Sequence, residues 1–208
     1  MTDSGGFWPQ NPALGQEMQT DIEDYEVDRA FIAHIALSAL QAVAFDADGV
    51  HAAFVATTTT AQTITTDISN PVYPRNITAT TAGTADDISA VSAIITGTDM
   101  ADEVITETLP VFTVNSGSKV EGDKAFKTIT SIYVPAMDGV GATIAVGWGD
   151  IFGLPFQKAA HHHIDTFFEN VKESTAPTFT ASATVLSSNT FDLDSTPDGS
   201  VIDCYLLV

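Results

Sequence analysis

Three consecutive histidines, His161–His163, are the residues of this 208-residue chain with the most obvious capacity to bind a metal ion. Consecutive side chains point about 100° apart on a helix and to opposite sides of a strand, so one ion cannot easily collect all three. A zinc site would need His34, His51 or carboxylates brought close by the fold. An exposed turn or an interface turn explains the histidines more simply. We therefore expect neither a bound metal nor another cofactor.

Two carboxylate patterns also resemble chemical sites. Asp46-Ala47-Asp48-Gly49 looks like the opening of a calcium loop, but the loop's twelfth position lacks the bidentate glutamate that such a site requires. Asp48-Gly49 is better interpreted as a hairpin turn. Glu103 and Glu107 would face the same way on a strand, and paired glutamates are the catalytic groups of glycosidases, but carboxylates on an exposed sheet face are usually only solvated.

The remaining reactive residue types favour no enzyme. The sequence contains no G-x-S-x-G motif, and its glycine-rich pieces, Gly139-Val140-Gly141 and Gly147-Trp148-Gly149, lack the lysine of a phosphate-binding loop. The single cysteine, Cys204, excludes an intrachain disulfide and is expected to be a buried, inert thiol. We expect no catalytic residues.

The charge of the chain narrows the range of partners. Seven lysines and arginines oppose 27 aspartates and glutamates, which gives a formal charge of -20 and a pI near 4.1. Binding to nucleic acid or to an anionic membrane needs basic side chains, so both are disfavoured. The acidity indicates a soluble, self-repelling surface, with adaptation to saline water as the alternative. The chain has neither an apolar run long enough to span a membrane nor a secretory signal, so we expect it to be made in the cytoplasm and to leave, if at all, by assembly and lysis.

The elements that must position these residues divide into an arm and one domain. Residues 1–25 are expected to form an extended arm, whose Phe7 and Trp8 bind a neighbour or fold back on their own domain. Acidic residues followed by apolar residues at helix-like spacing predict a helix over 26–44, and a strand over its second half is the competing prediction. The domain itself is expected to cover 26–208.

From residue 46 onward, the sequence predicts a mainly β, antiparallel sandwich or barrel of jelly-roll type. Short runs rich in Thr, Val and Ile are separated by turn residues, and two of them alternate with period two. Asp138-Gly139 and Asp198-Gly199 are further turn signals. Residues 159–173 interrupt the pattern and are expected to form a short helical or irregular insertion. The expected strands are His51–Ala56, Ala61–Thr66, Asn76–Thr80, Val91–Gly97, Val104–Phe112, Ala125–Val134, Thr143–Trp148, Thr178–Leu186 and Val201–Val208.

Several segments between residues 46 and 208 carry a resemblance to a known family. They are residues 70–80, which begin Asn70-Pro-Val-Tyr-Pro-Arg75, and 147–155, which begin Gly147-Trp148-Gly149-Asp150, together with 46–53, 97–110, 124–132, 138–143 and 196–208. Taken in order, these segments resemble a widespread group of small virion structural proteins of tailed bacteriophages. The resemblance implies membership of a phage particle, without fixing the position in it, and it implies no catalytic residues. The acidic segment before residue 46 and the three histidines depart from the pattern.

These observations lead to three hypotheses about function. The first is a capsid decoration, or cement, protein on the outer surface of the head, which binds the major capsid protein and copies of itself, as a trimer or another symmetric cluster. The second is a tail-tube or head-fibre component. The third is a carbohydrate-binding adhesion module with Trp148 and Tyr133 as stacking platforms. Phe7, Trp8, Arg75 and Trp148 are the expected interface residues, and Arg75 is also expected to pair with an acidic neighbour.

Overall fold

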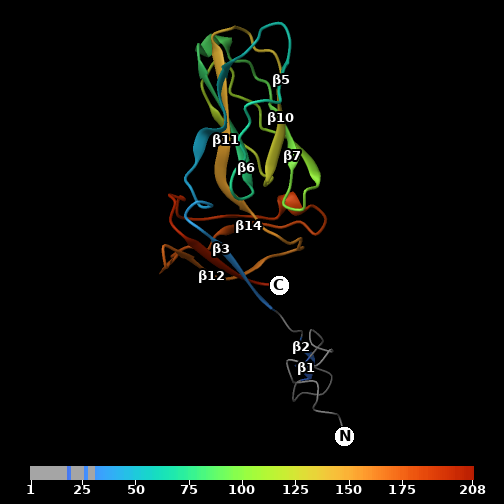
Figure 1. The fold of residues 1–208 in the computed structure, drawn as a ribbon, viewed down its shortest axis with the longest axis vertical. Helices are drawn as coiled ribbons and strands as arrows, with labels where there is room; N and C mark the ends of the chain where they lie inside the picture. The colour runs from blue at the N-terminus through green and yellow to red at the C-terminus, as the bar shows by residue number, and fades with distance from the viewer. Residues whose placement is uncertain (1–17, 20–25, 28–30) are drawn as a thin grey trace.

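The computed structural model describes residues 18–19, 26–27 and 31–208 (Figure 1). Most of the expected arm, including Phe7 and Trp8, lies outside the described residues, and β1 (Met18–Gln19) pairs with β2 (Glu26–Val27). The strands of the domain are antiparallel wherever they pair. They are β3 (Ile32–Leu37), β4 (Asp46–Val55), β5 (Gln62–Ile64), β6 (Arg75–Gly83), β7 (Ile94–Thr98), β8 (Val104–Thr108), β9 (Lys119–Glu121), β10 (Thr128–Val134), β11 (Ala142–Gly153), β12 (His162–Phe168), β13 (Val171–Lys172), β14 (Thr178–Thr180), β15 (Thr190–Asp192) and β16 (Ile202–Leu207). Short 3₁₀ turns, η2 (Ala85–Asp87) and η3 (Leu186–Ser188), complete the elements.

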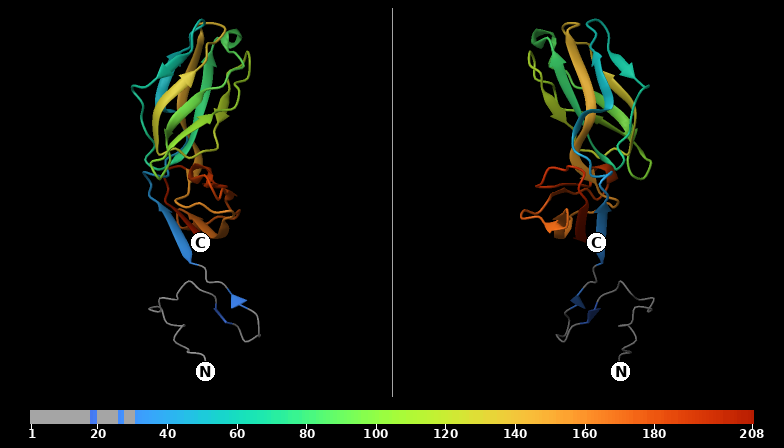
Figure 2. Two further views of the ribbon diagram at one scale, coloured as in Figure 1. Left: turned by 90° about the vertical axis from the view of Figure 1, so that its right-hand side faces the viewer. Right: turned by 60° about the vertical axis from the view of Figure 1, so that its left-hand side comes forward.

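Strands β4 to β11 form a jelly roll. One sheet has the order β4-β11-β6-β9 and the other has the order β5-β10-β7-β8. When these eight strands are counted from one to eight along the chain, the orders are 1-8-3-6 and 2-7-4-5, which is the double Greek key of a jelly roll. The two sheets lie face to face in the larger part of the molecule (Figure 2). The predicted mainly β, antiparallel fold is therefore confirmed, and its jelly-roll topology with it.

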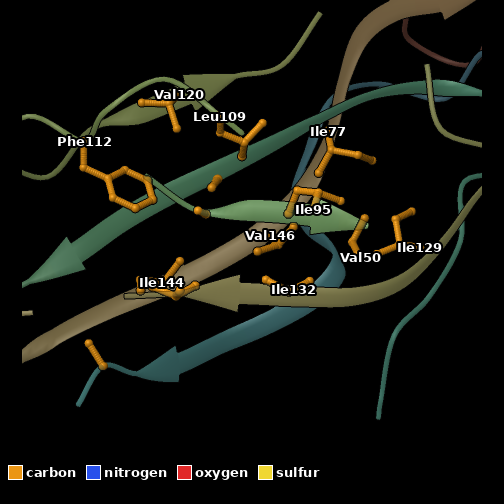
Figure 3. Packing of buried hydrophobic residues seen from close by; sticks show 14 of the residues in the cluster. Val50, Ile77, Ile95, Leu109, Phe112, Val120, Ile129, Ile132, Ile144 and Val146 are labelled. Carbon is orange, nitrogen blue, oxygen red and sulfur yellow. The ribbon is translucent and has the colours of Figure 1, made fainter. Parts of the chain in front are cut away.

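The space between the two sheets is filled by aliphatic side chains from both (Figure 3). Ile95 and Ile132, from neighbouring strands of one sheet, and Ile144 and Val146, from β11 of the other, are fully buried. Successive strand residues point to opposite faces, so the Val, Ile and Ala residues that alternate with threonine reach the core. Thr106 and Thr130 remain at the surface, whereas Thr78 and Thr81 of β6 are buried.

Strand β11 continues beyond the jelly roll into a smaller part of the molecule, at its other end, where two β layers pack together. Its first half, 142–148, pairs with both β4 and β6, and its last residues, 151–153, pair with β15. A second sheet, β13-β12-β16-β3, packs against this end and is called the terminal sheet below. The two layers enclose a separate core: Ile35, Leu37, Ala42, Phe152, Leu154, Phe191, Leu193, Ile202, Cys204 and Leu206. The chain thus has two cores joined by one strand.

The helix predicted over 26–44 is wrong. Residues 32–37 form β3, a turn follows, and residues 28–30 lie outside the described residues. Ile35 and Leu37 are buried while His34 and Ala36 are exposed, which is the period of a strand, because β3 pairs along its whole length with β16. Alanine fits either pattern. The competing prediction, a strand over the second half of this segment, has the right type of element, but β3 begins earlier and ends at Leu37, before most of that half.

The insertion predicted over 159–173 is also wrong in its form. Residues 162–172 make a β-hairpin, β12 and β13, closed by the two-residue turn Glu169-Asn170. Both turn residues have positive φ, 52° and 62°, as a type I′ turn requires.

Asp48-Gly49 does not form the expected hairpin turn, because it lies inside β4. A Cβ at Gly49 would lie 2.7 Å from the ring of Trp148 on the adjacent strand β11. Glycine is needed there to let this ring lie against the β4 backbone. Asp198-Gly199 does form a turn, with Gly199 at a φ of 91°.

Candidate functional site

The side chains of the three histidines have different surroundings. His161 Nε2 donates to Asn189 Oδ1 at 2.9 Å, His163 Nε2 and Thr166 Oγ1 lie 2.9 Å apart, and His162 is exposed. Burial lowers the pKa of His161 from its ordinary value. Among the described residues, no group of three or more His, Cys, Asp or Glu side chains is arranged to hold a metal ion.

Glu103 and Glu107 also have different surroundings. Glu107 on β8 accepts hydrogen bonds at Oε1 from the backbone N–H groups of Asp123, at 2.8 Å, and Lys124, at 3.2 Å. Burial raises the pKa of Glu107, against the effect of these two hydrogen bonds. Glu103 is exposed just before β8. Glu107 therefore holds the loop that follows β9 in place.

Arg75 lies where the two cores meet. Its side chain is 1% exposed; Nη1 donates to the Val43 carbonyl at 2.6 Å and Nη2 to Asp150 at 3.3 Å, and the guanidinium lies 4.6 Å from the centre of the Phe152 ring. Burial lowers its pKa to about 10. The expected pairing with an acidic neighbour is confirmed, and the partner belongs to the same chain.

Trp148 and Tyr133 belong to different strands of the jelly roll. Trp148 is half-buried against the jelly-roll core, and its Nε1 donates to the Ala44 carbonyl at 3.3 Å. Tyr133 is exposed on β10. Cys204 is buried in the second core, as expected, and burial raises its pKa.

The surface that brings the most binding chemistry together is the outer face of the terminal sheet. The register opposes His34 to Tyr205 and Phe167 to Asp203, and their side chains all point away from the core that contains Ile35 and Cys204. Two large aliphatic residues extend the same face: Ile32, 66% exposed, and Leu207, 39% exposed. The outer face is defined here as Ile32, His34, Phe167, Asp203, Tyr205 and Leu207.

The side chains at the centre of the outer face hold one another in place. The His34 and Tyr205 rings stack, with centroids 4.4 Å apart and planes 5° apart, and the Phe167 ring stands edge-on to Tyr205 at 6.2 Å and 89°. His34 Nε2 donates to Asp203 Oδ1 at 2.6 Å. Phe167, Asn170, Asp203 and Tyr205 line a shallow, open hollow of about 280 Å³. The hollow thus offers two aromatic walls, a carboxylate and an amide to a ligand.

Reasoning from the sequence missed this site. Its residues come from β3, β12 and β16, and the first two of these strands were expected to be helical or irregular. The alternation of Asp203 and Tyr205 with Ile202, Cys204 and Leu206 was a usable signal, because it places the polar and aromatic side chains on the face opposite the apolar ones.

Known proteins give no match. Comparisons with protein-family models, with curated proteins and with solved structures each found no matching protein. The resemblance to tailed-phage virion proteins therefore stays a hypothesis. Among the described residues, no helix has the length and apolar character needed to cross a membrane. What the chain does has to be argued from its own surfaces.

Proposed function

We propose that this protein is a structural subunit of a tailed-phage particle, most specifically a capsid decoration protein that stabilises the head through contacts between subunits. The observation that carries the proposal is the outer face of the terminal sheet. It presents aliphatic and aromatic side chains to solvent on a chain whose formal charge is -20. Exposed apolar side chains that lie next to one another in this way are typical of sites of interaction with other molecules.

The architecture supports the same proposal. Jelly rolls occur among viral capsid proteins, as well as in lectins and cupins, although a fold alone does not assign a function. The terminal sheet lies at the end of the molecule away from the jelly roll (Figure 1). A subunit of this shape can contact the shell with its terminal sheet while the jelly roll projects outward. The acidic surface suits the outside of a head better than its DNA-lined interior, because DNA would repel it.

In this proposal the mechanism is mechanical. Stable contacts between proteins bury about 1,200–2,000 Å² in all, so one small sheet face must be supplemented by further contacts. Copies grouped around a symmetry axis of the shell, with the major capsid protein beneath them, would supply that area. The added buried surface would resist the outward pressure of the packaged DNA.

Adhesion to carbohydrate is a second candidate, favoured by the aromatic hollow of the outer face. Sugar rings stack on aromatic side chains, and Tyr205 and Phe167 are better placed for this than the expected Trp148, whose ring lies against β4. A position in the tail tube or in a head fibre is a further alternative within the particle.

The location of the labelled chain on purified particles tests the proposal. A decoration subunit should cover the outer surface of the head at a fixed ratio to the major capsid protein, visible by electron microscopy with a tag on the chain. It should come off under mild treatment without dissolving the shell. A label confined to the tail, or no label on the particle, would refute the proposal.

A further inference from the structure

We propose that the hollow of the outer face binds the guanidinium group of an arginine presented by a partner protein. This inference concerns the chemistry of the hollow and goes beyond the proposed place in the particle. If the chain decorates a capsid, the arginine belongs to a capsid subunit.

The two aromatic walls have the geometry of a site for an organic cation. Phe167 and Tyr205 both line the hollow with their ring planes nearly perpendicular, and His34 covers one face of Tyr205, so a flat cation has to stack on a ring face that the hollow leaves open. Cations are attracted to the face of an aromatic ring by its quadrupole, and arginine is the residue most often found there. The planar guanidinium also stacks on rings better than a compact ammonium does.

The polar groups of the hollow are acceptors that match this cation. The Asp203 carboxylate accepts one hydrogen bond from His34 at Oδ1, and a carboxylate has capacity for several more. Asn170 lines the same hollow, and a side-chain amide has a carbonyl oxygen that accepts hydrogen bonds. A guanidinium carries five N–H donors and no acceptor, so it is complementary to both groups.

The charge balance of the chain favours a cationic partner over a neutral or anionic one. Acidic residues outnumber basic ones by 27 to 7, so the surrounding field attracts positive charge. Lys172, which lies opposite Phe167 in the hairpin, pairs with Asp165 at 2.5 Å. Cation–π contacts occur elsewhere in the chain: Arg75 lies over the ring of Phe152, and Lys119 lies over the ring of Phe45.

The hollow is organised before any ligand arrives. His34 stacks on Tyr205 and donates to Asp203, so one side chain fixes both a wall and the carboxylate. Asn170 is held by the tight turn between β12 and β13, where its φ is 62°. Side chains that are already ordered lose less entropy on binding.

Size and openness point to a side chain rather than a free small molecule. At about 280 Å³ the hollow lies at the lower limit of the ~300–1,000 Å³ clefts that enclose drug-sized ligands, and it is open rather than enclosed. A side chain that projects from a larger surface needs no such enclosure, because neighbouring contacts of that surface exclude water around it. Arginine is enriched at the centres of protein interfaces for this reason.

Titration of the full chain with Nα-acetyl-L-arginine amide, followed in aromatic ¹H–¹³C NMR spectra, tests the inference. The Tyr205 and Phe167 signals should shift saturably, while those of exposed Tyr133 on the jelly roll should not. The citrulline analogue, which has the same shape without the charge, should leave all of them in place. Asp203→Asn and Phe167→Leu should each weaken binding about threefold, as expected for one exposed ion pair or one exposed cation–π contact.

Asp86→Asn is the matched control for Asp203→Asn, because it removes one exposed carboxylate from the jelly roll and changes the net charge equally. It should leave arginine binding unchanged. Equal shifts with citrulline, equal effects of the two Asp→Asn variants, or no saturable shift would each overturn the inference. Saturable binding of a methyl glycoside at the same rings, with none of the arginine amide, would also overturn it and favour the carbohydrate alternative.

The two proposals fail separately. A chain found on phage heads that does not bind arginine keeps the proposed function and loses the site. A chain that binds arginine but is absent from particles keeps the site and loses the proposed function.

Discussion

At the scale of single residues, one buried asparagine organises the loops around the second core. Asn189 is fully buried and uses both ends of its amide. Its Oδ1 accepts from the backbone N–H groups of Lys158 and Ser182 and from His161 Nε2, and its Nδ2 donates to the carbonyl oxygens of Ser182 and Val185 at 2.8 Å. A buried polar group stabilises a fold only when it is satisfied in this way.

Replacing Asn189 by alanine should therefore destabilise the protein severely. The change leaves backbone donors and acceptors from separate segments buried without partners, and we expect the free energy of unfolding to fall by about 3 kcal/mol or more. Urea unfolding followed by fluorescence measures the loss. Gln157→Ala, at an exposed polar residue next to Lys158, is the control and should change stability by less than about 0.5 kcal/mol. A loss at Asn189 as small as that of the control would contradict the role assigned to it.

The contacts of single residues were predictable from the sequence only where the composition of the chain limits the type of partner. Arg75 was expected to pair with an acidic residue and does so with Asp150. The asparagine network was not predictable, because its partners lie between residues 158 and 185 in loops without a periodic signal. The binding hollow was missed for a related reason, since it needs His34 and Tyr205 to be adjacent across a sheet whose edge was expected to be helical.

At the scale of elements, the β12–β13 hairpin supplies two of the residues that line the hollow, Phe167 and Asn170. Its turn residues, Glu169 and Asn170, have positive φ, which asparagine and glycine tolerate better than branched side chains. Asn170→Val should lower the free energy of unfolding by about 1–2 kcal/mol. Asn170→Gly should keep the stability, because it keeps the turn.

Thermal unfolding of the two Asn170 variants distinguishes backbone strain from the loss of the amide group. Both variants lack the amide that lines the hollow, and only the valine variant strains the turn. Equal stability of the valine and glycine variants would contradict the type I′ turn.

Most strands were predictable from short runs rich in Thr, Val, Ile and Ala, whereas β3, β9, β12, β13 and β15 were missed. Predicted strands fall on β4, β5, β6, β7, β8, β10, β11, β14 and β16. Strands β9 and β15, of three residues each, are too short to show a period. Strand β3 was hidden because alanine fits a helical face as well as a strand, and only pairing with β16 decides between them.

At the scale of the whole molecule, buried carboxyl groups and the net charge make stability depend on pH. Burial raises the pKa of Glu107, Asp150 and Asp192, so these groups hold protons in the folded state at pH values where the unfolded chain has released them. Their contribution is therefore present near pH 4 and is lost as pH rises through the folded pKa values. Acid also relieves the self-repulsion of the net charge of -20.

We therefore expect the thermal midpoint of unfolding to be higher at about pH 5, which is close to the ordinary pKa values of carboxyl groups, than at about pH 8. His161 acts in the opposite direction, because its lowered pKa makes protonation below about pH 6.5 unfavourable in the folded state. Asp192→Asn should raise the midpoint at pH 8 and reduce the gain in acid. The control Asp194→Asn removes an exposed carboxylate two residues away and should reduce the gain less. A midpoint that falls steadily from pH 8 to pH 5 would contradict this balance.

The account as a whole depends on the terminal sheet being the surface that binds the particle, and one comparison tests this directly. Full-length Ile32→Asp and Val104→Asp each place a charge at a strongly exposed aliphatic residue; Ile32 is 66% exposed on the outer face and Val104 is 75% exposed on β8 of the jelly roll. The occupancy of each variant on phage heads stripped of the native subunit is measured by electron microscopy and by quantification of the bound chain. We predict that Val104→Asp binds as the wild type does and that Ile32→Asp, folded to the same thermal midpoint, leaves the heads bare. Equal occupancy of the two variants would contradict the account.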